Sequence, residues 1–212
     1  MKILPKLVII GAGGFGRETM SWAAQSVQFG VEWTIKGFID DNLQALIGKR
    51  SHGRLLSRIQ DYVPLDEDVF VCAIGIPQVK RRCSELLLAR GARFTQLHHR
   101  TAVIADGAQI CDGAILSPYS IVSTDARLGF GVGLNLHATV DHDAEVGDWT
   151  QVNCHCDVTA SVVIGREVFM GSSVSVIPGV KIGDSAVIGA GAVVTRDIPA
   201  LAKAYGVPAR VR

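Results

Sequence analysis

Residues 140–170 read VDHDAEVGDWTQVNCHCDVTASVVIGREVFM, and this stretch decides the fold because its pattern repeats every six residues. An aliphatic side chain or methionine returns at every sixth position from Ile104 to Val194, without a break in register. Four residues after each of these positions comes a small or β-branched residue, from Ala108 to Ile198. A period of six fits neither the α-helix nor the two-residue alternation of a strand. The pattern predicts a solenoid built from hexads.

Each coil of this solenoid should contain three hexads, so that 18 residues make one triangular turn. The large aliphatic side chains face inward, the small ones lie near the corners, and neighbouring coils pair as parallel strands about 4.8 Å apart. The repeat supplies about five such coils, and residues 18 apart should lie one above the other. We expect glycine and asparagine to supply the positive φ that the turns need, at Gly129, Asn135, Gly147, Asn153, Gly165, Gly171, Gly183 and Gly189.

The chain before the repeat is organised differently. Short apolar runs typical of strands alternate with segments of helical patterning, at residues 7–10, 35–39, 69–74 and 93–97 for the strands, and from residue 16 and over 77–90 for the helices. Such alternation predicts a small βαβαβ unit with a mostly parallel sheet. The sequence thus predicts an α/β Rossmann-like domain over residues 1–97, an all-β parallel solenoid over 98–198 and a C-terminal tail over 199–212.

The composition argues against several classes of partner. The 212 residues carry a formal net charge of +1, and the longest basic cluster is residues 80–82, so nucleic-acid binding is not expected. The five cysteines are odd in number and form no CxxC pair, and no apolar run reaches the roughly 18 residues of a membrane span. We therefore expect a cytoplasmic protein that does not bind membranes.

A glycine-rich loop follows the first predicted strand and opens the first predicted helix. Residues 11–16 read GAGGFG, a GxGxxG pattern whose backbone amides could cradle a diphosphate. Asp40 and Asp41, at the end of the second strand, stand where an acid could reach a ribose or a base. Fewer than 100 residues precede the repeat, which suits a mononucleotide better than a dinucleotide. The alternative is that the loop only packs a helix closely on a strand.

The six-residue repeat, with its inward and corner positions, resembles that of the hexapeptide-repeat acyltransferases. This resemblance implies coils that wind left-handed, against the usual rule for parallel crossovers. It also implies a homotrimer, because small-molecule sites in trimers of this fold form on the outer faces between subunits. The polar residues on the outside of the coils are therefore the candidates for chemistry.

The histidines of the repeat sort into columns. His137 and His155 are 18 residues apart and should stack on adjacent coils, whereas His142 lies near the next corner and is followed by Asp143. Acyl transfer to an amine needs a base, and imidazole suits neutral pH. Asp143 could accept from the second ring nitrogen and fix the tautomer of His142, although a polar corner without chemistry would look the same. Cys156 occupies a small inward position, so we expect it in the core rather than as a nucleophile.

Residues 140–148, VDHDAEVGD, resemble the His-Asp or His-Glu segment of the family of sialic-acid O-acetyltransferases and bacterial nucleotide-amino-sugar N-acetyltransferases. That family joins a small Rossmann-like domain to the β-helix and often closes with Gly-Val-Pro-Ala, here at residues 206–209. The resemblance implies an acetyl-CoA-dependent N-acetyltransferase of polysaccharide biosynthesis that acts on a nucleotide-linked amino sugar. It assigns the proton acceptor to His142 and the neighbouring acid to Asp143. We expect direct transfer, with no acyl-enzyme and no metal.

The same resemblance assigns binding residues. For acetyl-CoA they match Gln151, where the family often has a second histidine, and three positions along the solenoid edge that act mainly through backbone amides, Ala160, Ser172 and Ala190. For the nucleotide part of the acceptor they match Gly13, Gly14, Phe15, Asp40, Asp41, Gly75 and Ile76. The solenoid is thus expected to hold the acyl donor and the N-terminal domain the acceptor.

Three alternatives stay open. His137 and His142 have the spacing of two zinc ligands in trimeric β-helical carbonic anhydrases, but those enzymes place their remaining histidine where this chain has Thr101. His98 and His99 are close in number and are expected to fall outside the repeat register. The solenoid could be a trimeric scaffold without activity. The acceptor atom could also be a hydroxyl, of a sialic acid or of serine, although serine carries no phosphate for the glycine loop to hold.

Overall fold

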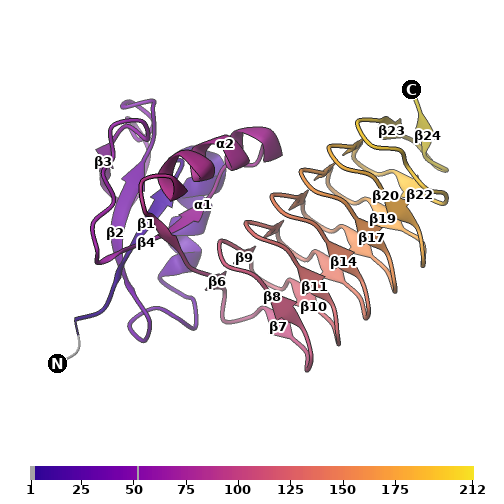
Figure 1. The fold of residues 1–212 in the computed structure, drawn as a ribbon, viewed down its shortest axis with the longest axis horizontal. Coiled ribbons are helices and arrows are strands. Elements are labelled where there is room, and N and C mark those ends of the chain that lie inside the picture. Colours follow the sequence, from indigo (N-terminus) through magenta and orange to yellow (C-terminus); the bar gives the residue numbers. More distant parts are fainter. Residues whose placement is uncertain (1–2, 52) are drawn as a thin grey trace.

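The computed structural model describes residues 3–51 and 53–212. An N-terminal α/β domain packs on one end of a three-sided parallel β-solenoid, as the sequence predicts (Figure 1). The C-terminus lies at the far end of the stack of coils. Across the described part of the chain, no helix has both the length and the apolar character needed to cross a lipid bilayer.

The N-terminal domain has a five-stranded parallel sheet in the order β3-β2-β1-β4-β5. Alternate side chains of its central strand face opposite helices, because Leu7 and Ile9 pack with helix α1 while Val8 and Ile10 pack with helix α2. A central parallel strand is buried on both faces, which explains its continuous apolar run. The elements are β1 (Lys6–Ile10), α1 (Gly14–Ala23), β2 (Thr34–Ile39), β3 (Leu55–Ser57), β4 (Asp68–Cys72), α2 (Pro77–Leu88) and β5 (Arg93–Phe94).

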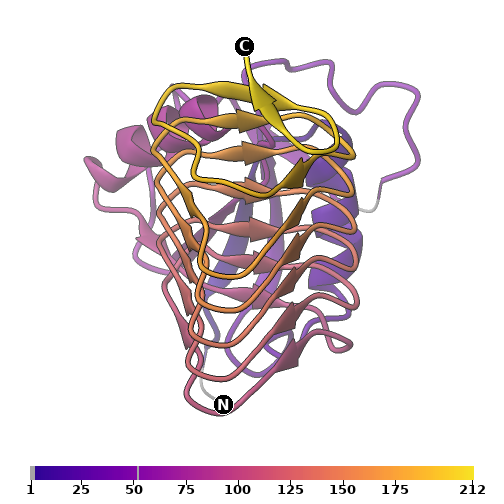
Figure 2. The same cartoon turned by 90° about the vertical axis from the view of Figure 1, so that its right-hand side faces the viewer.

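The solenoid has one sheet on each of its three sides (Figure 2). Paired residues are 18 apart, as in Val122 with Val140, so the predicted coil length is confirmed. Sheet D contains β6 (Leu97–His98), β9 (Ile115–Leu116), β12 (Gly133–Leu134), β15 (Gln151–Val152), β18 (Phe169–Met170), β21 (Val187–Ile188), β23 (Lys203–Tyr205) and the antiparallel β24 (Arg210–Val211). Sheet E contains β7 (Val103–Ile104), β10 (Ile121–Val122), β13 (Thr139–Val140), β16 (Asp157–Val158), β19 (Ser175–Val176) and β22 (Val193–Val194). Sheet F contains β8 (Gln109–Ile110), β11 (Arg127–Leu128), β14 (Glu145–Val146), β17 (Val163–Ile164) and β20 (Lys181–Ile182).

Three corners join these sheets. The His142 corner connects sheet E to sheet F through residues 105–108, 123–126, 141–144, 159–162 and 177–180. The ladder corner connects sheet D to sheet E through residues 117–120, 135–138, 153–156, 171–174 and 189–192. The domain corner connects sheet F to sheet D through residues 111–114, 129–132, 147–150, 165–168 and 183–186.

Both predicted registers meet in one continuous core. Large inward side chains such as Val140 and Met170 are buried together with small ones such as Ala144 and Cys156. Burying one such aliphatic side chain contributes about 1.5–3 kcal/mol, so the repeated core is the main stabilising feature of the solenoid. The first coil is the exception, because no coil precedes Ile104, which stays 41% exposed.

The expectation that the turn glycines and asparagines supply positive φ is wrong. Positive φ falls two residues later in each turn, for example at Gly131 rather than Gly129 and at His137 rather than Asn135. The glycines are needed for a different reason. A Cβ on Gly147 would come within 2.6 Å of the carbonyl carbon of the glycine on the next coil. Glycine is present because the backbones of adjacent coils approach closely.

Substitutions at two glycines separate these explanations. We expect Gly147→Ala to lower the free energy of unfolding by about 3 kcal/mol, because the new methyl group meets backbone that cannot move aside. Gly191→Ala should cost only about 1–2 kcal/mol, since Gly191 has φ of +69° but open space around its missing Cβ. Urea denaturation of both variants measures the difference. A larger loss at Gly191 would contradict the close-approach explanation.

His98 also departs from its predicted place, because it lies within the repeat register. The strand β6 pairs with β9, so His98 stands beside Leu116 in an inward-facing column. Burial lowers the pKa of His98 to about 4, so its ring is neutral at physiological pH. The inward-facing positions therefore begin one strand before Ile104, and the first of them is His98.

Candidate active site

His142 and Asp143 lie together at the His142 corner, in the turn between β13 and β14. The Nδ1 atom of His142 is 2.8 Å from the Oδ2 atom of Asp143, and the two side chains are 60% and 61% exposed. Asp143 has φ of 60°, a left-handed conformation that aspartate tolerates better than most residues. With Nδ1 donating to the carboxylate, Nε2 is the ring nitrogen left to accept a proton.

Adjacent coils fix the backbone of this pair. The amide of Asp143 donates to the carbonyl of Thr124 on the coil before, at 3.2 Å. The carbonyl of His142 accepts from the amide of Ser161 on the coil after, at 3.0 Å. The side chains point outward from a rigid support, which is the placement that a general base for an external substrate requires.

The edge positions predicted to contact acetyl-CoA occupy two different corners. Ala160 lies one coil after His142, at the same corner. Ser172 and Ala190 lie at the ladder corner, on the other edge of sheet E, and both are exposed. One chain therefore brings Ala160, but not Ser172 and Ala190, to the corner of His142.

Gln151 lies at neither of these corners. It is part of β15 in sheet D, is 1% exposed, and its Oε1 accepts a hydrogen bond from Lys80 Nζ at 2.9 Å. The same Nζ donates to the carbonyl of Gly131 at 3.2 Å. The amide of Gln151 thus joins the solenoid to helix α2 and has no exposed surface for a cofactor. The buried position of Gln151 therefore argues against its predicted contact with acetyl-CoA.

Lys80 gives this contact a pH dependence. Desolvation by burial lowers the pKa of Lys80 to about 8, from 10.5 for an exposed lysine. Between these values the unfolded chain binds more protons than the folded chain, so this group makes stability rise with pH. We expect the unfolding free energy of the wild type, measured relative to Lys80→Met, to increase from about pH 8 to about pH 10.5. The slope should not exceed about 1.4 kcal/mol per pH unit. Urea titrations across this range check it, and a difference that stays flat would contradict the lowered pKa.

The predicted nucleotide site lies at the carboxyl edge of the N-terminal sheet. Residues 13–14 follow β1, residues 40–41 follow β2 and residues 75–76 follow β4, and β1 is the neighbour of both other strands. The structure therefore gathers these residues at one edge. Gly13, Gly14 and Gly75 have no atom within 4 Å of the position a Cβ would take. Helices α1 and α2 both begin at this edge without a side-chain cap, which is an arrangement that attracts anions.

Side chains at this edge already have partners within the chain. Asp40 Oδ2 accepts from the amide of Ala12 at 2.7 Å, and Asp41 Oδ1 accepts from a backbone amide after β3 at 3.0 Å. Phe15 is half-buried and packs edge-on against Trp22, with ring centroids 6.1 Å apart. Asp40 thus shapes the glycine loop, and its contact with a ribose stays a prediction.

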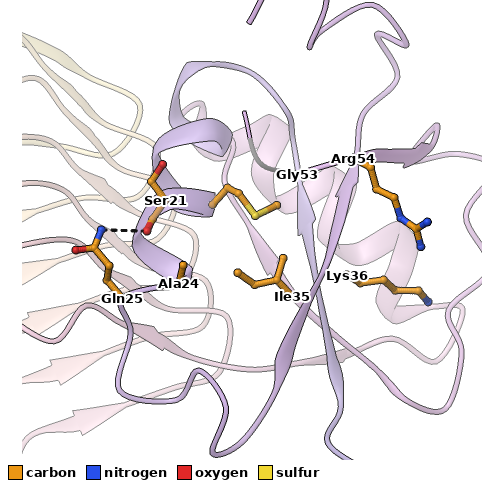
Figure 3. Close-up of a pocket in the computed structure, with 8 residues that line it drawn as sticks. Ser21, Ala24, Gln25, Ile35, Lys36, Gly53 and Arg54 are labelled. Carbon is orange, nitrogen blue, oxygen red and sulfur yellow. Dashed lines mark hydrogen bonds between the residues drawn. The ribbon is translucent and has the colours of Figure 1, made fainter. Parts of the chain in front are cut away.

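A cavity of about 650 Å³ lies elsewhere on the N-terminal domain (Figure 3). Lys36 points away from helix α1 and pairs with Asp68 at 2.6 Å, so its charged end does not face the α1 side of the cavity. None of the residues predicted to bind substrate lines this cavity. Its walls are Met20, Ser21, Ala24, Gln25, Ile35, Lys36, Gly53 and Arg54.

Three rings form a stack at the ladder corner. Tyr119, His137 and His155 are 18 residues apart, with ring centroids separated by 5.1 and 5.0 Å and planes within 10° of parallel. The predicted stacking of the two histidines is confirmed, and Tyr119 extends it. His137 and His142 lie at opposite ends of β13, so a single chain does not bring them together as zinc ligands. Within the described residues, no group of three or more His, Cys, Asp or Glu side chains could hold a metal ion.

Cys156 lies in the solenoid core, as predicted. Its Sγ donates to the carbonyl of Gly171 at 2.9 Å, and burial raises the pKa of the thiol to about 11. The thiol therefore stays protonated at neutral pH. This protonation argues against Cys156 as an acyl carrier.

Comparisons with known proteins agree with this architecture. Residues 6–87 match the PglD N-terminal domain, and residues 161–196 match the hexapeptide repeat of succinyl-transferase. The GDP-perosamine N-acetyltransferase of Escherichia coli O157:H7 is 32% identical over 125 residues, which cover 57% of this chain. The match spans 55% of the length of that relative.

Solved structures match over nearly the whole chain. The acetyltransferase domain of PglB from Neisseria gonorrhoeae FA1090 has a TM-score of 0.88 at 26% identity, covering 98% of this chain and 99% of its own. That domain is also known in complex with acetyl coenzyme A. PerB from Caulobacter crescentus, in complex with CoA and GDP-perosamine, has a TM-score of 0.87 at 25% identity, covering 98% of this chain and 97% of its own. Residues 6–87 and 161–196 are thus similar to a PglD N-terminal domain and to a hexapeptide repeat, and the chain as a whole is similar to solved acetyltransferase structures.

Proposed function

We propose that this chain is an acetyl-CoA-dependent N-acetyltransferase whose acceptor is a nucleotide-linked amino sugar. The observation that carries the proposal is the exposed, hydrogen-bonded pair of His142 and Asp143 on the outside of a hexapeptide solenoid. The open glycine edge of the N-terminal domain supports a nucleotide acceptor. The proteins similar to this chain include a GDP-perosamine N-acetyltransferase. The similar solved structures include complexes with acetyl coenzyme A and with CoA and GDP-perosamine.

In the proposed mechanism, the amine of the sugar attacks the thioester carbon of acetyl-CoA while His142 Nε2 takes a proton from the amine. Asp143 holds the proton on Nδ1 and stabilises the imidazolium that forms. Backbone amides at the solenoid edge stabilise the oxyanion of the tetrahedral intermediate. The C–S bond then breaks, and His142 returns the proton to the departing thiolate, so CoA leaves as the thiol.

We propose that the active form is a homotrimer, because one chain divides its site between two corners. Sheet E carries exposed apolar side chains at Val103 and Ile121, and it is bounded by the His142 corner and the ladder corner. Three such faces can close a triangle around an axis, so that the ladder corner of one copy meets the His142 corner of the next. This contact would place Ser172 and Ala190 of one copy near His142 of its neighbour.

The cellular setting follows from the same chemistry. All five cysteines are free thiols, which suits the reducing cytoplasm where nucleotide sugars are made. We place the acetylated product in the assembly of a polysaccharide, since nucleotide-linked sugars are activated for transfer.

Asp143 has a smaller expected effect than its neighbour. We expect Asp143→Asn to lower kcat by about 10-fold, less than the loss of a general base, because the carboxylate is exposed and solvent screens its interaction with the ring. An amide can still hold the ring but no longer stabilises the imidazolium. Initial rates of thiol release measure this. A loss as large as that of a His142 variant would show that Asp143 itself handles the proton.

The direct test of the proposed function is thiol release from acetyl-CoA with a panel of acceptors. The panel contains GDP-, UDP-, dTDP- and CMP-linked sugars, each with an amino group or with a hydroxyl at the same carbon. The proposal expects turnover with at least one amino sugar. Turnover with CMP-sialic acid alone would favour the O-acetyltransferase alternative, and no turnover with any acceptor would favour the scaffold.

A further inference from the structure

We infer that Lys80 is a positioning residue, which fixes where the N-terminal domain holds the acceptor relative to the coil that carries His142. This inference rests on the proposed function for its kinetic consequences and on the interdomain contacts for its structural part. Lys80 does not touch the reacting atoms. It acts through Ile76 on one side and Gln151 on the other.

Lys80 is the only buried lysine or arginine side chain in the described residues, with 1% exposure. Both acceptors of its Nζ belong to the solenoid, Gly131 O at 3.2 Å and Gln151 Oε1 at 2.9 Å. Both acceptors are neutral, so no carboxylate offsets the cost of burying the ammonium group. A neutral amine has two hydrogens for these two acceptors, so the contact is satisfied in either protonation state.

The backbone of Lys80 belongs to the first turn of helix α2, where its amide makes the ordinary helical hydrogen bond to the carbonyl of Ile76 at 2.9 Å. Ile76 belongs to the loop at the predicted nucleotide edge. Gln151 belongs to the same 18-residue coil as His142, nine residues further along the chain. One residue therefore connects the nucleotide edge to the coil of the catalytic pair.

Contacts near Lys80 also hold the N-terminal domain on the solenoid. Phe130 of the domain corner packs between Phe94 of the N-terminal domain and Trp149, with ring centroids 5.2 and 4.7 Å away. At the rim, Arg81 pairs with Glu167 at 3.0 Å. Aromatic packing tolerates sliding, whereas two directed hydrogen bonds from a buried amine do not. Lys80 adds two directed hydrogen bonds to those that join residues 25–28 to residues 98–100, and together these contacts fix one orientation of the domain.

Kinetics of matched variants test this role, with GDP-perosamine as the acceptor probe. Lys80→Met keeps the volume but removes both hydrogen bonds, and it should lower kcat/KM for the acceptor by about 10- to 100-fold, because small displacements of reacting groups have effects of this size. The KM for acetyl-CoA should stay within about twofold. Gln151→Glu is isosteric and still accepts from Lys80, so it should keep wild-type kinetics toward both substrates. Arg82→Met changes an exposed residue on the same helix and serves as the control.

Three results of these measurements bear on the positioning role of Lys80. Unchanged acceptor kinetics in Lys80→Met, or equal losses toward both substrates, would overturn the positioning role. A raised KM for acetyl-CoA in Gln151→Glu would return Gln151 to the cofactor site and also overturn it. If Lys80→Met fails to fold, the double variant Lys80→Met with Gln151→Met leaves no unpaired amide and takes its place.

Hydrogen–deuterium exchange separates failure of this inference from failure of the proposed function. Loss of the contact should speed exchange in helix α2 and in residues 147–152, and leave residues 160–194 unchanged. Unaltered exchange in helix α2 would overturn the inference even in an active enzyme. Faster exchange in a chain that acetylates nothing would leave the domain contact supported and the proposed function rejected.

Discussion

Replacing His142 by alanine is expected to lower kcat by about 10²- to 10⁴-fold, the usual consequence of losing a general base. The side chain is 60% exposed and lies outside the solenoid core, so the solenoid should stay intact. Its backbone hydrogen bond to Ser161 is unaffected by the substitution. Initial rates of thiol release at saturating acetyl-CoA measure the loss, with thermal unfolding as the check on folding.

His137→Ala is the matched variant that separates the role of a base from that of a zinc ligand. His137 stacks in the ladder at the far end of β13 and takes no part in the proposed proton transfer. If the two histidines were zinc ligands of one site, the two variants should lose activity equally and lose bound metal together. Near-normal turnover in His142→Ala would remove His142 from the role of base.

The second large effect concerns two adjacent valines in the solenoid. Val162→Asp is expected to lower the free energy of unfolding by more than about 4 kcal/mol, because Val162 is fully buried and its replacement places an unpaired carboxylate in the core. Val163→Asp should change it by less than about 1 kcal/mol, since Val163 faces outward and is 38% exposed. Its partners on the neighbouring strands are Glu145 and Lys181, whose charges offset each other.

Urea denaturation and far-ultraviolet circular dichroism of the two variants provide the comparison. The contrast is sharp because the substitutions are chemically identical and one residue apart. Equal destabilisation by both variants would mean that the hexad register is not the one described, and the outward placement of His142 would lose its basis.

The sequence predicted the solenoid well because each inward position depends on a local rule. An uninterrupted period of six specifies which residues face inward, and pairing at an interval of 18 follows from it. The pair of His142 and Asp143 could be placed on the outside for the same reason. The strand β3, by contrast, has only three half-buried residues, and nothing in its sequence separates it from a loop.

Contacts between distant segments could not be predicted. Lys80 lies three and seven residues before Cys83 and Leu87, on the buried face of helix α2, but only the docking of this helix on sheet D makes it a partner of Gln151. The prediction of positive φ at the turn glycines was wrong for a related reason. Their identity reflects the approach of the next coil, as at Gly147, and not the φ of the residue itself. Periodicity states which residues are neighbours but not how closely their backbones meet.

We propose that this chain transfers an acetyl group from acetyl-CoA to the amine of a nucleotide-linked sugar. The measurement that tests it most directly is the amount of thiol released per acceptor consumed, with GDP-perosamine and with the matching GDP-sugar that carries a hydroxyl in place of the amine. We predict one thiol for each amino sugar consumed and no release above background with the hydroxyl sugar. Equal release with both sugars, or release that does not depend on either, would contradict the claim.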